Sequence, residues 1–412
     1  MFHKENRMQE IDATLAPYAT KHSEAVRDSQ EITPRFLLPF DSDVTKITDS
    51  FAFRALARKT QSFFSPKMDV ITTRNTHSIS GVEDHAYYVG GPMALNLNVS
   101  LLRAIARGHD RGHTPFGHAG EKALHSMTAF RHEEQSYRIA TALNNENLCV
   151  QTLDGIRNHS SGDGFTGIAK DTHMTHEGAL IELMDKTSEM ISGLRDLLHY
   201  DVITPEEIPE TSLYRLGITH EMLVQNPDSA FDIMKFRFLD SIIEASRDID
   251  KAMTKRIHMG ENERIAILEL KKFRSSLRKT KPKMQERDEY AARATELVIN
   301  YFRANPDELL KSELHYHMHQ RNPQHYEEVY CRTATLERKI ADVFSSLSDS
   351  AVIDMCREID RVAARDIFKN LLGTSGPVKQ FSVKRTLASG KDISTILIPK
   401  NQPGNTPTIP KK

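Results

Sequence analysis

Residues 101–127 read LLRAIARGHDRGHTPFGHAGEKALHSM. Apolar residues in the first part of this stretch recur at helical spacing, which predicts an amphipathic helix ending in His109 and Asp110. Gly112 and Pro115 then break that helix, and a second helix is expected to begin around residues 119–121. The turn between the two helices gathers five polar side chains within 13 residues: His109, Asp110, His113, His118 and Glu121.

Such a cluster favours a metal ion. A carboxylate and several imidazoles are costly to bury together unless they are paired or bind a cation. Neutral imidazole nitrogens and carboxylate oxygens are natural ligands of divalent metals. The dipeptide His109-Asp110 alone is weak evidence, because an aspartate capping a turn beside a histidine is common. The following GHTPFGHAGE (112–121) makes a metal site the better interpretation. Ten of the 19 histidines also lie between His77 and His176, which indicates a polar site in this region.

The composition excludes several classes of protein. Charged residues make up 27% of the 412 residues and balance to a net charge of -1, so no basic field indicates nucleic acid. Three scattered cysteines (Cys149, Cys331 and Cys356) cannot close a disulfide framework and fit a reducing compartment. The N-terminal residues lack the apolar core of a secretory signal, and no run of 18 apolar residues occurs. We expect a cytoplasmic protein without a membrane span.

The apolar spacing predicts an almost wholly helical chain, hence an all-α fold. Residues 153–178, rich in Gly, His, Ser and Asp, are expected to form an irregular loop or a pair of short elements. The basic residues 278–287 include a proline and predict a hinge between helices. A single strand is considered at 393–398.

Six blocks of sequence, in order, resemble those of one known family. They are ITDSFAFRALARKTQSFF (47–64), RNTHSISGVEDHA (74–86), GHDRGHTPFGHAGEKAL (108–124), FRHEEQSYRIA (130–140), LIELMDKTSEMISGLRDLL (180–198) and ADVFSSLSDSAVIDMC (341–356). The chain resembles the dGTPase-like branch of the HD-domain superfamily, the deoxynucleoside triphosphate triphosphohydrolases, over residues 45–360. The resemblance implies an HD helical bundle at 46–260, preceded by an N-terminal arm (1–45). A C-terminal helical region (261–386) and a flexible tail (387–412) are expected to follow.

The resemblance implies four metal ligands: His77, His109, Asp110 and Asp185. The residue types agree with it, because two imidazoles and two carboxylates from three helices give a mixed nitrogen and oxygen site with open positions. Mn²⁺ or Mg²⁺ is the first expectation, with Fe²⁺ or Zn²⁺ as alternatives. Asp185 lies on an otherwise apolar helical stretch, where an unpaired carboxylate is costly.

The resemblance also implies catalytic roles. His118 and Glu121 are three residues apart, so on a helix the carboxylate can orient the imidazole, and His118 is implied as proton donor to the leaving 5′-oxygen. His113 and His132 correspond to phosphate-contacting histidines, Arg74 and Lys186 to cations on the triphosphate, and Gln61 to a sugar contact. The implied reaction is attack of metal-activated water on the α-phosphorus, which releases nucleoside and inorganic tripolyphosphate. Taken singly, each of these residues has an ordinary structural interpretation as a surface charge, a helix-terminal acid or a loop residue.

Three positions depart from the family pattern. Where the family often carries a tyrosine and an aspartate that help to hold the sugar, this chain has Glu189 and Gly193. Arg111 replaces an aliphatic residue and is expected to affect packing more than chemistry. We therefore expect an active enzyme with an altered sugar pocket.

Two other signals are interpreted as structural. The histidines of HYHMHQ (315–320) are taken as surface residues rather than metal ligands, and the basic residues 274–283 as a solvated linker rather than a binding site for single-stranded DNA. A homo-oligomer is expected by resemblance. The competing functions are an HD phosphohydrolase acting on nucleoside monophosphates or cyclic nucleotides, and a nucleotide-sensing regulator with little turnover. dGTP is the default substrate.

Overall fold

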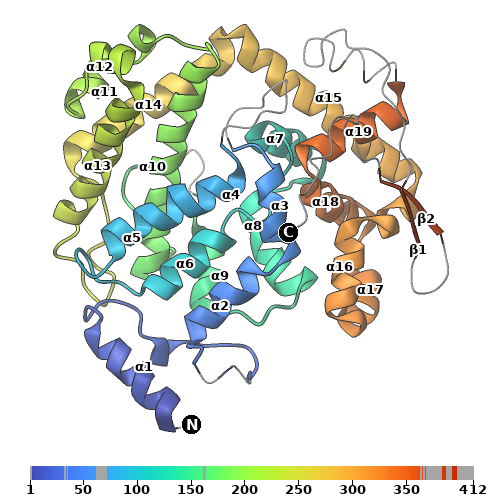
Figure 1. Ribbon diagram of the computed structural model, residues 1–412, viewed down its shortest axis with the longest axis horizontal. Helices are drawn as coiled ribbons and strands as arrows, with labels where there is room; N and C mark the ends of the chain where they lie inside the picture. The colour runs from blue at the N-terminus through green and yellow to red at the C-terminus, as the bar shows by residue number, and fades with distance from the viewer. Residues whose placement is uncertain are drawn as a thin grey trace, which may run out of the picture. The chain divides into compact units, whose positions relative to one another are not determined.

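The computed structural model describes residues 2–31, 34, 36–61, 72–160, 164–361, 364, 367, 383–386 and 392–396, with side chains from residue 5 to residue 367. Within these ranges the fold is all-α, as the sequence predicts, and the only named strands form one hairpin. Met1–Phe368 form one compact unit and Lys369–Lys412 a second. Figure 1 shows the arrangement of the helices.

The helix α10 (His176–His199) is the axis of the first unit. Thr175 caps it by accepting a hydrogen bond from the Gly178 amide, and most of its residues are buried. A helix buried on nearly every side must have partners all round. Its partners, some of which cross in front of it in Figure 1, surround it. They are α5 (Asp84–Gly90), α6 (Val99–Gly108), α9 (Val150–Asn158), α13 (Pro227–Ala245), α14 (Glu261–Thr280) and the π-helix η3 (His77–Glu83).

The turn after α6 has the predicted break between two helices. His109 is the C-terminal cap of α6. Gly112 approaches helix α8 (His132–Arg138) so closely that a Cβ there would lie 2.4 Å from the Ser136 amide nitrogen. Phe116 (φ 63°) and Gly117 (φ 59°) adopt left-handed conformations, which end the turn. The second helix, α7 (Gly117–Thr128), therefore begins slightly earlier than expected.

The N-terminal residues are tied to this core rather than separated from it. Glu177 of α10 accepts hydrogen bonds from the Thr20 amide (3.1 Å) and the Asn98 amide (2.9 Å). Residue 45, the end of the expected N-terminal arm, lies inside helix α2 (Pro39–Thr48). The elements before the first site residues are α1 (Phe2–Thr14), η1 (His22–Glu24), α2 (Pro39–Thr48), α3 (Phe51–Ala55), η2 (Leu56–Arg58) and α4 (Arg74–Thr76).

The remaining helices continue the same compact unit. Residues 261–361 pack on the earlier helices, with α15 against α7, within the same compact unit. The predicted hinge at 278–287 is reduced to one residue, Lys281, between α14 and α15. These elements are α8 (His132–Arg138), η4 (Ile139–Leu143), η6 (Pro205–Glu207), α11 (Glu210–Arg215), α12 (His220–Gln225), α14 (Glu261–Thr280), α15 (Pro282–Ala304), η7 (Pro306–Lys311), α16 (Glu313–Arg321), η8 (His325–Tyr330), α17 (Cys331–Thr333), α18 (Leu336–Ser346) and α19 (Asp349–Ile359).

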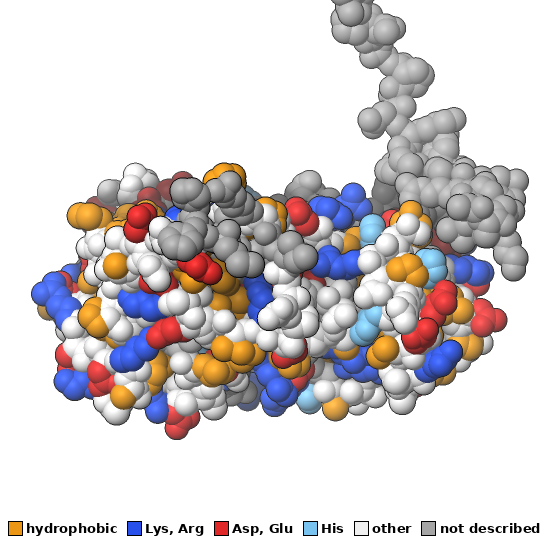
Figure 2. Space-filling model, turned by 90° about the horizontal axis from the view of Figure 1, so that it is seen from below, with side chains coloured by type: hydrophobic (Ala, Val, Ile, Leu, Met, Phe, Trp, Pro, Cys, Tyr) orange, Lys and Arg blue, Asp and Glu red, His pale blue; other side chains and the backbone are white. Residues whose placement is uncertain are grey.

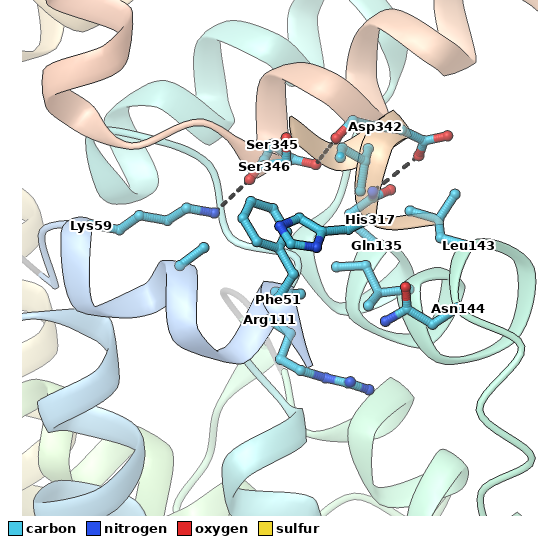
Figure 3. A pocket seen from close by; sticks show the side chains of 14 residues that line it. Phe51, Lys59, Arg111, Gln135, Leu143, Asn144, His317, Asp342, Ser345 and Ser346 are labelled. Atoms are coloured by element: carbon cyan, nitrogen blue, oxygen red, sulfur yellow. Dashed lines mark hydrogen bonds between the residues drawn. The ribbon is translucent and has the colours of Figure 1, made fainter. Parts of the chain in front are cut away.

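Two buried residues join α18 and α19 to the turn after α6. Lys59 Nζ donates to the carbonyls of His113 (2.7 Å) and Ser345, the second bond being drawn in Figure 3. Asp349 accepts hydrogen bonds from the amides of Thr60 (3.1 Å) and Phe116 (2.9 Å). Burial and the nearby Arg74 lower the pKa of Lys59 to about 7, although Asp349 opposes the shift.

Beside Lys59 lies a cavity of about 20 Å³, lined by residues that include Phe51, Arg111 and Asp342 (Figure 3). That volume is enough for one water molecule. Arg111, which stands where an aliphatic residue was expected, donates to Glu146 at 2.9 Å. The two side chains form a buried ion pair.

The second unit is described only at its two strands. β1 (Val383–Thr386) pairs antiparallel with β2 (Asp392–Ile396). The strand considered at 393–398 thus corresponds to part of a hairpin. The rest of the tail expected from residue 387 lies outside the described residues.

Candidate metal and active site

The four predicted metal ligands lie near one another, on η3, in the turn after α6 and on α10. His77, His109 and Asp185 form one group of possible metal ligands, and Asp110 groups with His109 and His159. The His77 Nε2 atom lies 2.9 Å from Asp185 Oδ1, and His109 Nε2 lies 3.8 Å from the same oxygen. Asp110 Oδ2 is 3.6 Å from His109 Nε2. All four side chains are buried.

The chemistry of this donor set fits a divalent cation. The His109 Nδ1–H donates to the Ala106 carbonyl over 2.7 Å, which fixes the tautomer and leaves a lone pair on Nε2. That Nε2 is buried and has no hydrogen-bond partner among the described residues. An unpaired nitrogen facing two carboxylates is costly to bury unless it binds a cation.

Each of the two carboxylates is also contacted by a cation. Arg74 Nη1 donates to Asp110 Oδ2 at 2.8 Å, and Lys186 Nζ lies 3.0 Å from Asp185 Oδ2. Although burial opposes ionisation, Arg74 and Lys186 keep the pKa values of Asp110 and Asp185 well below their usual range. Both carboxylates are therefore charged at neutral pH.

The two predicted triphosphate cations have different surroundings. Arg74 is only 2% exposed and also donates to the Gln61 carbonyl at 2.8 Å, whereas Lys186 lines a cleft. The Gln61 side-chain amide is buried and has no hydrogen-bond partner among the described residues. The sequence directly after Gln61 lies outside the described residues.

Glu121 is shared by two histidines. Its Oε2 lies 3.1 Å from His118 Nδ1, as the sequence predicts, and its Oε1 lies 2.8 Å from His132 Nδ1. The His113 and His132 rings stack with centroids 4.7 Å apart. Burial opposes protonation of His132, but Glu121 raises its pKa to about 9. His118 is about one-third exposed and faces the cleft.

His159 joins this cluster and was missed in the sequence. Its Nε2 lies 3.1 Å from His132 Nε2, and it groups with His109 and Asp110 as a set of possible metal ligands. It follows directly after α9, in the stretch interpreted as irregular. The enrichment of histidine in this region was the only signal for it.

The site opens into a cleft of about 980 Å³. Residues of α7, α8, α10, α14 and α15 line it, among them Glu189, Gly193, Arg274 and Arg278. The interpretation of residues 274–283 as a linker is therefore wrong for Arg274 and Arg278, although Arg278 is exposed to solvent as expected. They lie on helix α14, and the interhelical linker is the single residue Lys281.

The histidines of 315–320 do not group as metal ligands among the described residues. They lie on helix α16. The expectation of surface residues is wrong for His315, which is 1% exposed and hydrogen-bonded to the Tyr326 hydroxyl at 2.7 Å. His317 stacks on Phe51, with centroids 4.4 Å apart (Figure 3).

In the view of Figure 2, basic and acidic side chains are interspersed over the described surface. This face therefore has no large area that is only positive or only negative. Among the described helices, none has the length and apolar character needed to cross a membrane.

Comparison with known proteins identifies the family of this chain. A family model described as HD domain matches residues 75–190, a range that includes all four predicted ligands. A deoxyguanosinetriphosphate triphosphohydrolase-like protein of Caldanaerobacter subterraneus subsp. tengcongensis is 32% identical over 354 residues, covering 84% of this chain and 92% of that protein. Proteins of the same name from Desulfatibacillum aliphaticivorans (28%; 84% and 94% covered) and Ruegeria sp. (36%; 48% and 58% covered) are also similar. The chain is thus a hydrolase with an HD domain, and it belongs to the deoxyguanosinetriphosphate triphosphohydrolase-like family.

Proposed function

We propose that this protein hydrolyses deoxynucleoside triphosphates, with dGTP as the first substrate to test, to deoxynucleoside and inorganic tripolyphosphate. The observation that carries the proposal is the His118–Glu121 couple, which faces the cleft directly beside the buried histidines and aspartates. The names of the similar proteins support a nucleotide substrate.

His77, His109, Asp110 and Asp185 would hold one divalent ion, with Mn²⁺ or Mg²⁺ proposed first. Such an ion supplies Lewis-acid polarisation of a phosphate oxygen and lowers the pKa of a water molecule.

The chain's own residues supply the remaining chemistry. Because Glu121 contacts His118 Nδ1, the other ring nitrogen, Nε2, is directed to the cleft and can donate a proton to the leaving 5′-oxygen. His113 and His132 lie next to the His118 ring, where they can contact a phosphate. Lys186 lies between Asp185 and the cleft and supplies positive charge for the developing negative charge on the phosphate.

The test is to incubate the purified protein with each of the four dNTPs and Mn²⁺ and to resolve the products by ³¹P NMR. Tripolyphosphate is the expected product. A parallel incubation with a nucleoside monophosphate that releases orthophosphate, while the dNTPs give no product, would support the first competing function. dNTP binding without any product would support a regulator. His118→Ala should abolish turnover. His199→Ala, at the end of α10 and outside the cleft, is the control.

A further inference from the structure

The Glu189 carboxylate lies among three groups that can carry positive charge. Its Oε1 is 3.6 Å from both His118 Nε2 and Arg274 Nη2, and its Oε2 is 3.6 Å from Lys186 Nζ. Direct hydrogen bonds between such groups are about 2.7–3.2 Å long. The Glu189 carboxylate therefore lies near three side chains from α7, α10 and α14, and none of them makes a close hydrogen bond to its oxygens.

Arg274 reaches this position because residue 193 has no side chain. A Cβ at Gly193 would lie 2.7 Å from both Cζ and Nη2 of Arg274. The guanidinium thus lies against the backbone of α10, where its Nη1 donates to the Glu189 carbonyl at 3.2 Å. The two departures from the family pattern, Glu189 and Gly193, are in contact with the same arginine.

The surroundings of Arg274 favour an anion. Eight Lys or Arg side chains and three glutamates line the cleft, although the whole chain carries a net charge of -1. A guanidinium offers a planar fork of donors that matches phosphate oxygens, and it is always charged.

We infer that Arg274 is a phosphate-binding residue of the substrate cleft, and that Glu189 is an internal anion which the substrate's phosphate replaces. The inference rests on the proposed function in taking the substrate to be a polyphosphate ester. Before substrate binds, Glu189 compensates cations that would otherwise repel one another in a partly buried site. Once a polyphosphate is bound, the same carboxylate repels it. Glu189 thus stabilises the free protein and weakens polyphosphate binding.

Two variants should change the binding of inorganic tripolyphosphate in opposite directions. The probe is added to the full-length protein with Mg²⁺ in excess, and binding is measured by calorimetry and by the shift in Tm. Arg274→Gln should weaken binding about tenfold, the loss expected for one charge-assisted hydrogen bond. Glu189→Gln should lower the Tm of the free protein yet tighten tripolyphosphate binding. A purely structural contact between α10 and α14 would weaken binding in both variants.

Gly193→Ala is the complementary variant. It keeps Arg274 but displaces its guanidinium, and alanine is a better helix former than glycine, so the fold is retained. Binding should weaken here too. Arg264→Gln, which removes an exposed arginine on the same helix paired with Glu261, should leave binding unchanged.

Tripolyphosphate binding that is absent from the wild type, or unchanged in Arg274→Gln, would overturn the inference. So would weaker binding in Glu189→Gln. These measurements need no turnover, so they stand even if dNTP hydrolysis is not detected. If the protein does hydrolyse dNTPs, Arg274→Gln should raise KM more than it lowers kcat, because the contact is already made in the bound substrate.

Discussion

Arg74 donates a hydrogen bond from Nη1 to Oδ2 of Asp110 over 2.8 Å, and both side chains are almost wholly buried. An arginine that the sequence assigns to the triphosphate is therefore the closest partner of a predicted metal ligand. Residues that orient a metal ligand typically change metal affinity by about 10- to 100-fold when they are removed.

We predict that Arg74→Gln lowers the affinity for Mn²⁺ by at least about tenfold. Metal content after dialysis, measured by plasma mass spectrometry, tests this. Arg103→Gln removes an arginine whose side chain is 44% exposed and which pairs with Glu83, away from the predicted ligands, and it should retain the wild-type metal content. Full metal content in Arg74→Gln together with a raised KM would instead support a direct contact with the substrate.

Removal of the metal should destabilise the protein. A ligand at 100 times its Kd stabilises the folded state by about 2.7 kcal/mol. We expect Mn²⁺ to raise the Tm of the chelator-treated wild type and to leave that of Asp185→Asn unchanged. Asp228→Asn, an exposed aspartate with the same change of charge, should respond like the wild type. An equal Tm shift in Asp185→Asn would show that the metal binds elsewhere.

Glu121→Gln should lower kcat by about 100-fold, in the range of a lost general acid, with little change in KM. The reason is that one carboxylate orients both His118 and His132. Steady-state kinetics on the hydrolysed dNTP gives both parameters. Glu134→Gln removes an exposed carboxylate from α8 and serves as the control. A kcat within about threefold of wild type would contradict the role of Glu121 in proton transfer.

Lys59 should make stability depend on pH. Its pKa is lowered by burial to about 7 in the folded protein and is near 10.4 in an unfolded chain. Between these values the unfolded state binds more protons, so the contribution of Lys59 to stability rises as pH increases from about 7 towards 10.

The measurement is the free energy of unfolding of wild type and Lys59→Met from pH 6 to 9. The wild type should gain relative to the variant as pH rises. Lys283→Met is the control, because Lys283 also donates to two backbone carbonyls but is exposed. A constant difference between wild type and Lys59→Met would show that Lys59 does not titrate in this range.

The part of the site that could be predicted lies close together in the sequence. His109, Asp110, His118 and Glu121 share one turn between two helices, so helical spacing and turn residues already constrain their positions. The helix of Asp185 was visible as one apolar face interrupted by a carboxylate. The all-α fold followed from the same spacing.

What was missed depends on contacts between distant segments. Arg274 meets Glu189 across 85 positions, and nothing in the spacing of a basic stretch tells a solvated surface from the wall of a cleft. His159 lacked a motif of its own. His315 was taken as a surface residue because the packing of α16 against its neighbours cannot be seen in its alternating histidines.

Because of the hydrogen bonds made by Lys59 and Asp349, residues 75–190 depend on parts of the chain outside that range. Residues 75–190 include the four predicted metal ligands. The turn that carries two of them is held by hydrogen bonds to residues outside this segment, namely Lys59 before it and Asp349 of α19 after it. If residues 75–190 were placed alone in another protein, these hydrogen bonds would be lost. The His113 carbonyl and the Phe116 amide would then have no partner. Loops between α10 and α18 can therefore accept insertions and deletions only where α18 and α19 still contact Lys59 and the turn after α6.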